Sequence, residues 1–104
     1  MSTRCTVIAY FYAKPEKRRE LQAILEDFVA QTRKESGCIN YHLHQSDKNP
    51  DVFVFYENWA TRKDWEVHNQ QPFLKGFLDK KTDYLTRDIE VESYRMLSED
   101  DLRP

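Results

Sequence analysis

A histidine follows a tryptophan by three residues in the segment ENWATRKDWEVH, which spans positions 57–68. If this segment is helical, Trp65 and His68 lie on the same face, one turn apart. A neutral imidazole accepts a proton near neutral pH, so His68 is a candidate general base beside an aromatic wall. The alternatives are a metal ligand and a packed core histidine that donates to a backbone carbonyl. These residues alone do not decide between the three.

Polar side chains interrupt the apolar segment VFVFYENW at positions 52–59. A carboxylate in such a stretch must be paired or hydrogen-bonded, or its pKa must rise, so Glu57 needs a partner. We interpret Glu57 and Trp59 as supporting residues, with Glu57 orienting His68 or holding the architecture together. Asn58 is a candidate hydrogen-bond donor to a ring oxygen, or else a residue of the strand–helix junction.

Aromatic residues are frequent, and several of them could form a box around a flat ligand. Ordinary core packing is the alternative for most of these side chains. Trp65 is the strongest candidate because it shares a helix face with His68. The candidate substrate-binding residues are Trp65, Tyr41, Phe55, Asn58, Phe73 and Phe77.

Metal and cofactor motifs are missing from the sequence. His42 and His44 share one strand face, but no third ligand is evident, so we interpret them as exposed or interface histidines. Cys5 and Cys38 have no CxxC spacing and are expected to be buried free thiols. The chain has only two glycines and no glycine-rich phosphate loop. We therefore expect no metal and no organic cofactor.

Length and charge narrow the class of protein further. The 104 residues predict a single domain over 1–97, followed by an acidic C-terminal tail at 98–104. A net charge of -2 gives no reason to expect a nucleic-acid partner. The longest apolar run, at 7–13, is too short to span a membrane. The N-terminus has no signal-peptide pattern, so we expect a cytoplasmic location.

The spacing of apolar residues, alternating in strands and helical in helices, predicts the elements that hold these residues. Strands are expected at 6–13, 38–45, 52–59 and 89–97, with the turn SDKNPD making the second and third an antiparallel hairpin. In the second strand, Ile39 is expected to share a face with Tyr41 and Leu43. A first helix begins near Pro15, and Gly37 is expected as its left-handed cap. The apolar stripe of this helix is Leu21, Ile24, Leu25, Phe28, Val29 and Thr32.

Two further helices precede the last strand. Thr61 and Asp64 resemble a capping box that begins the helix of Trp65 and His68, and Pro72 begins a third helical segment. The order β-α-β-β-α-β predicts an α+β, ferredoxin-like fold with an antiparallel sheet. The helices cover only one face of that sheet, yet the third strand is apolar on both. A second copy of the chain is the expected cover, which predicts a homodimer.

Two segments, ESGCINYHLHQ and FVFYENW, are followed by His68 and then by QPF. Together they resemble the antibiotic biosynthesis monooxygenase family. The resemblance covers nearly the whole chain and implies a dimeric α+β barrel in which two ferredoxin-like protomers pack sheet against sheet. It also implies that the helical histidine lines a cavity. The positions that carry it are Glu35, Gly37, Cys38, Tyr41, Glu57, Trp59, His68, Pro72 and Phe73.

The family resemblance implies a reaction. The expected activity is a cofactor-independent monooxygenase that oxidises a quinol or phenolic ring with O₂. The expected roles are His68 as base, Trp65 and Phe55 as walls, and Asn58 or Tyr41 as partner of the ring oxygen. The alternatives are an isomerase or detoxifying enzyme of the same fold, and a non-catalytic dimeric binder of small aromatics.

Overall fold

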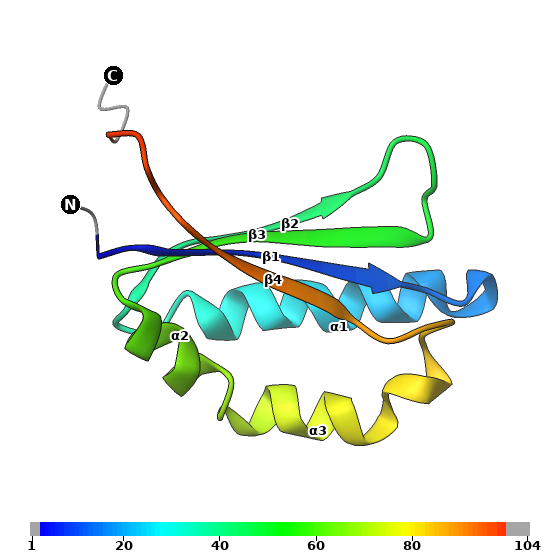
Figure 1. Cartoon of the computed structure of the whole chain (residues 1–104). Coiled ribbons are helices and arrows are strands. Elements are labelled where there is room, and N and C mark those ends of the chain that lie inside the picture. The colour runs from blue at the N-terminus through cyan, green and yellow to red at the C-terminus, as the bar shows by residue number, and fades with distance from the viewer. Residues whose placement is uncertain (1–2, 100–104) are drawn as a thin grey trace.

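The computed structural model describes residues 3–99, which form a four-stranded sheet and three helices (Figure 1). The strands run in the order β2-β3-β1-β4, and each is antiparallel to its neighbours. This is the predicted ferredoxin-like arrangement. The strands are β1 (Cys5–Tyr12), β2 (Cys38–Gln45), β3 (Val52–Trp59) and β4 (Glu90–Arg95), and the helices are α1 (Arg18–Thr32), α2 (Arg62–His68) and α3 (Pro72–Lys80).

The three helices begin where the sequence provides a start signal. Pro15 lies in a short 3₁₀ turn, Pro15–Lys17, and α1 begins only after that turn. Thr61 caps α2, because its hydroxyl accepts a hydrogen bond from the backbone N–H of Asp64 at 3.2 Å. Pro72 is the first residue of α3, where its missing N–H costs nothing. The predicted helix starts at Thr61 and Pro72 are thus confirmed.

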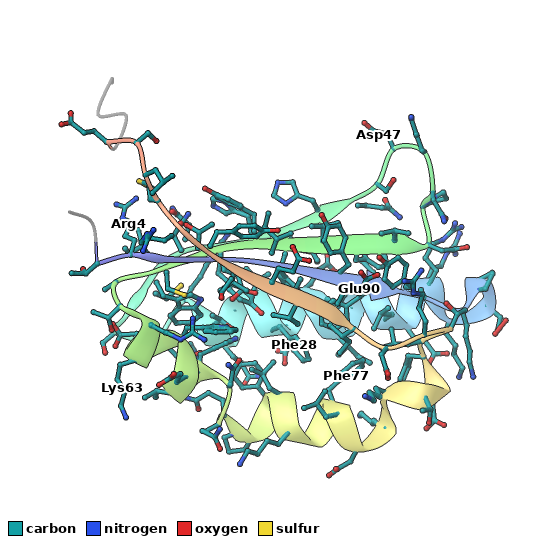
Figure 2. The ribbon with its side chains drawn as sticks, in the orientation of Figure 1. Arg4, Phe28, Asp47, Lys63, Phe77 and Glu90 are labelled. Carbon is teal, nitrogen blue, oxygen red and sulfur yellow. The ribbon has the colours of Figure 1, made fainter. Side chains whose placement is uncertain are left out.

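All three helices lie on one side of the sheet, and the core fills the space between them (Figure 1). Alternate residues of β1 and β3 point into this core, including the fully buried Trp59 and Phe55. Burying one large apolar side chain contributes roughly 1.5–3 kcal/mol to folding. Phe28 of α1 and Phe77 of α3 lie edge to face with ring centroids 5.6 Å apart, below the sheet in Figure 2. The core therefore joins α1 and α3 through direct aromatic contact.

The opposite face of the sheet carries no helix (Figure 1), and some of its aromatic side chains remain accessible. Tyr56 on β3 and Tyr94 on β4 are 40% and 47% exposed. Both lie next to β1 residues of this face, Ile8 and Thr6 respectively, in the strand register. The single chain therefore leaves its aromatic outer sheet face uncovered.

Gly37 does not adopt the predicted left-handed conformation, because no glycine in the described part of the chain has a positive φ. The position needs a glycine for a different reason. A Cβ atom on Gly37 would lie 2.2 Å from Cγ of Asp64 in the first turn of α2. The loop after α1 therefore presses against the start of α2, and no side chain fits between them.

Ile39 also departs from the prediction. The β2–β3 register shifts between Cys38 and Asn40, so Ile39 is an extra residue with no partner and is 40% exposed. Cys38 takes the position opposite Trp59. The expectation that Ile39 shares the inner face with Tyr41 was wrong, because an irregularity in the pairing resets the alternation of faces.

Several smaller predictions can be compared with the described residues. Both cysteines are free thiols, with Cys5 buried and Cys38 half-buried. The last strand ends at Arg95, two residues earlier than predicted. Most of the predicted acidic tail, 100–104, lies outside the described residues. No helix within 3–99 is both long and apolar enough to cross a membrane.

Candidate functional site

A cavity of about 480 Å³ lies between the inner face of the sheet and the three helices. Its size falls within the range of small-molecule sites, and most of its wall is apolar. The polar side chains on its wall include one histidine and one buried glutamate. The lining residues are Ala9, Phe11, Phe28, Tyr41, Glu57, Trp65, His68, Asn69, Leu74, Phe77, Leu78, Lys81, Asp88, Ile89 and Val91.

His68 is the last residue of α2 and is only 3% exposed. Its Nδ1 lies 2.8 Å from Oε2 of Glu35. A carboxylate accepts hydrogen bonds, so this contact favours the tautomer in which Nδ1–H donates to Glu35 and Nε2 carries a lone pair. Nε2 makes no hydrogen bond within residues 3–99, and the ring lines the cavity. His68 thus presents an unprotonated nitrogen to whatever occupies the cavity.

The surroundings of His68 favour its neutral form. Burial lowers the pKa of the imidazole below its usual value, and the hydrogen bond and negative charge of Glu35 offset part of this effect. Trp59 packs over the ring with centroids 4.5 Å apart, and Tyr41 lies edge-on at 5.5 Å. A neutral, oriented imidazole between two aromatic rings is suited to accept a proton.

Glu35 reaches His68 because the loop after α1 is held tightly. Arg33, just after α1, donates two hydrogen bonds to the backbone carbonyl of Tyr41, at 3.0 and 3.2 Å. The Gly37 carbonyl accepts a hydrogen bond from the Ala60 backbone N–H at 2.9 Å. These bonds fix the loop against β2 and the start of α2. The carboxylate of Glu35 is then directed at the other end of α2, with a side chain that is 13% exposed.

Glu57 lies on the same wall of the cavity and is 4% exposed. Its Oε1 accepts a hydrogen bond from Nε1 of Trp59 at 3.0 Å. Burial raises the pKa of the carboxyl, the bond from Trp59 lowers it somewhat and the negative charge of Glu35 raises it, which together give a pKa of about 7. No Lys or Arg of residues 3–99 forms an ion pair with it. The site therefore contains a carboxyl group that changes protonation state near neutral pH.

Tyr41 completes the polar end of the cavity. Its side chain is 2% exposed, and its ring lies 4.7 Å from that of Phe55 behind it. Burial, together with the nearby charge of Glu57, raises the pKa of the Tyr41 phenol well above its usual value. Tyr41 therefore stays protonated at physiological pH and contributes an aromatic surface to the cavity wall.

Five of the residues predicted from the sequence come together on this wall: His68, Trp65, Tyr41, Phe77 and Glu57. Trp65 is half-buried, and its ring also lies under the guanidinium of Arg62 at 5.3 Å.

Three other predicted residues support the cavity from behind. Phe55 and Trp59 are buried directly behind Tyr41 and His68. Phe73 packs against His68 and Phe28, with ring centroids 6.2 and 5.4 Å away. These side chains fix the lining groups without reaching the cavity themselves.

Asn58 is the exception among the predicted residues. It follows Glu57 in the strand and so points to the opposite face of the sheet. There its Nδ2 donates to Oδ1 of Asn40 at 3.2 Å, and the hydroxyl of Thr6 donates to its Oδ1 at 2.6 Å. These bonds satisfy the Asn58 amide between three strands and leave it outside the cavity.

Two features were not recognised from sequence reasoning. Glu35 was noted only as part of a motif, because its contact with His68 joins residues 33 positions apart. Lys81 and Asp88, paired at 3.2 Å, lie at another part of the cavity wall, and no local pattern marks them. Within residues 3–99, no group of three or more His, Cys, Asp or Glu side chains has an arrangement that could hold a metal ion.

Comparison with known proteins identifies the family to which the chain is similar. Residues 4–80 match the sequence profile of the family described as antibiotic biosynthesis monooxygenase. The structure of Rv0793 from Mycobacterium tuberculosis superimposes with a TM-score of 0.87 and 28% identity, over 94% of this chain and 99% of that one.

Two relatives are similar in sequence over 83 residues, which is 80% of this chain. YcnE of Bacillus subtilis, provisionally named a monooxygenase, is 30% identical, and the match covers 87% of its length. The Synechocystis protein sll1783 is 31% identical, and the match covers only 56% of its length. This chain therefore corresponds to about half of the Synechocystis relative.

Proposed function

The chain belongs to the antibiotic biosynthesis monooxygenase family, and we propose that it oxidises a quinol or phenolic ring with O₂ without a metal or organic cofactor. The monooxygenase-like character follows from the family and from the provisional names of relatives such as YcnE. The substrate class, the use of O₂ and the roles of individual residues are our proposal. The observation that carries it is the hydrogen bond from His68, which lines a largely apolar cavity, to Glu35 behind it.

The first step assigned to the protein is removal of a phenolic proton. Glu35 accepts a hydrogen bond from Nδ1 of His68, which orients the ring and leaves Nε2 free to act as the base. A neutral phenol reacts slowly with O₂, whereas a phenolate is electron-rich and can donate an electron to it. Removal of the proton therefore begins the reaction, and the substrate itself supplies the electrons.

The second contribution is the shape of the cavity. Trp65, Phe77 and Phe28 provide flat apolar walls for a ring, and a bound ring displaces water from these walls. The phenolate and O₂ then combine as a radical pair at a ring carbon. The resulting peroxide collapses to a quinone with loss of water. The Tyr41 hydroxyl is a neutral donor for the ring oxygen during this sequence.

We also propose that the working unit is a homodimer. The outer sheet face exposes Tyr56 and Tyr94 and carries no helix (Figure 1). A second copy of the same face is self-complementary and would bury these rings. The proposed arrangement leaves one cavity in each protomer, on the helical side of its sheet.

The proposal is tested by oxygen uptake with a panel of quinols and phenols that differ in ring number. The expected result is oxygen consumption with at least one of them, together with formation of the corresponding quinone. Binding of panel compounds, detected by thermal shift, without oxygen consumption would contradict the proposal and support a non-catalytic binder. Isomerisation of a small carbonyl compound without O₂ would instead support the alternative enzyme class.

A further inference from the structure

We propose that Glu57 is a second proton-transfer group of the cavity, which donates a proton to the ring-bound peroxide and then removes the hydrogen from the same ring carbon. This inference rests on the proposed oxidation. It addresses the steps that follow removal of the phenolic proton. Breaking the O–O bond requires a proton on the peroxide and loss of the ring hydrogen, and a second group that performs both leaves the phenolic proton on His68 until hydroxide departs.

The position of Glu57 gives it access to the substrate. The side chain lines the same cavity as His68 and is paired with Tyr41 in the strand register. Trp59 occupies Oε1 through its indole N–H at 3.0 Å, and the Trp59 ring also packs on His68 at 4.5 Å. The other oxygen, Oε2, has no hydrogen-bond partner anywhere in residues 3–99. Glu57 thus has one oxygen anchored beside the base and one oxygen available to a ligand.

The charges around Glu57 favour its protonated form. The titratable groups that interact with it are Glu35 from the loop after α1, Tyr41 and Cys38 from β2, and Cys5 from β1, and His68 from α2 lines the same cavity. None of these is a permanent cation, and Glu35 adds a negative charge. Together with burial this raises the pKa of Glu57 to about 7, where a carboxyl group both donates and accepts protons readily.

The chemistry balances with these two groups and O₂. His68 Nε2 takes the phenolic proton, and the phenolate transfers electrons to O₂ as a C–O bond forms, which gives a ring peroxide anion. Protonated Glu57 donates to the terminal oxygen of this peroxide. The Glu57 carboxylate then removes the hydrogen of the same carbon. The C–H electron pair forms the C=O bond, the O–O bond breaks, and the leaving hydroxide takes the proton from His68 to become water. Both side chains return to their starting states.

A purely structural role makes a different prediction. As an acceptor for the Trp59 indole, Glu57 can be replaced by Gln, whose side-chain carbonyl accepts the same hydrogen bond. Gln cannot release a proton. Glu57→Gln therefore keeps the anchor and removes the proposed chemistry, and it is the variant that separates the two roles.

The experiment measures three quantities on the wild type and on Glu57→Gln. With a phenol that the wild type oxidises, we expect KM to stay within about twofold and kcat to fall roughly 10²-fold, because a positioned proton donor contributes about 10²–10⁴-fold. We expect the wild-type pH profile to lose its limb near neutral pH in the variant. Anaerobic mixing with 4-nitrophenol should form bound phenolate equally in both, because this step needs only His68.

Each outcome has a distinct meaning. An unchanged kcat and pH profile in Glu57→Gln overturns the role of Glu57 and leaves the proposed oxidation standing. Infrared difference spectra between acidic and basic pH give a readout that does not depend on turnover. A Glu57 carboxyl that is fully ionised at pH 6 overturns the inference in either case. If the wild type oxidises no phenol, the proposed function fails, and the role of Glu57 fails with it.

Discussion

Glu57 makes the stability of the fold depend on pH in a direction that can be calculated. The folded protein holds a proton on this carboxyl up to about pH 7, whereas the unfolded chain releases it near the ordinary value of 4.5. Between these values the folded state binds more protons, so the free energy of unfolding falls as pH rises. The loss is complete above about pH 7. Replacing Glu57 by Gln removes this titration from both states.

The size of the effect follows from the same two values. The interval between 4.5 and about 7, at about 1.4 kcal/mol for each pH unit, gives a penalty of roughly 3 kcal/mol. Because Glu57 is almost fully buried, solvent screening reduces this figure little. Glu57→Gln should therefore be more stable than the wild type by roughly 3 kcal/mol at pH 8, and nearly equal to it at about pH 4.

Urea unfolding followed by tryptophan fluorescence, at one protein concentration and several pH values, measures this difference. The pKa of His68 is lowered on folding, so the stability that its neutral form contributes is lost as pH falls. This loss occurs in both the wild type and Glu57→Gln, so it cancels when their free energies of unfolding are compared. A difference in the free energy of unfolding between Glu57→Gln and the wild type that stays constant from pH 4 to pH 8 would refute the reasoning. A variant that is less stable at pH 8 would show that Glu57 is a well-paired carboxylate.

Three further predictions concern the loop, the base and the assembly. Gly37→Ala should destabilise the fold by about 1–3 kcal/mol because its Cβ meets a neighbouring carboxylate group. The matched control Gly76→Ala, on an open helix surface, should stabilise it by about 0.5–1 kcal/mol in the same urea assay; equal effects would contradict this. Glu35→Gln should lower kcat/KM about tenfold or more with little change in melting temperature, since an amide no longer enforces the His68 tautomer. Tyr56→Glu should convert the proposed dimer to a monomer in sedimentation velocity at micromolar concentration, and a wild type that is already monomeric would disprove the proposed dimer.

Local patterns were sufficient to predict most of the fold. The stripe of α1 repeats with the period of a helix, and Leu21, Leu25, Phe28 and Thr32 are indeed its buried residues. The Thr61 cap and the polar turn at 46–51 were equally local, and both lie where expected. Each of these features depends on residues within a few positions of one another, so the sequence contains the whole signal.

The site was predicted less completely because its key contacts are tertiary. The pairing of Glu35 with His68 and the contact of Gly37 with Asp64 join segments that only the folded chain brings together. Asn58 is different. Neighbouring residues of a strand point to opposite faces, so Asn58 and Glu57 cannot both face the cavity. The sequence therefore contained enough information to choose between those two residues, whereas the orienting role of Glu35 required the fold.

The most direct test of the central claim is the oxygen-dependent turnover of His68→Gln, measured with its melting temperature on the same preparation. Gln can still donate a hydrogen bond to Glu35, so the variant should fold and melt near the wild type. Loss of the base should lower turnover by about 10²–10⁴-fold. A variant that melts earlier but keeps its specific activity would contradict this account and make His68 a packing residue only.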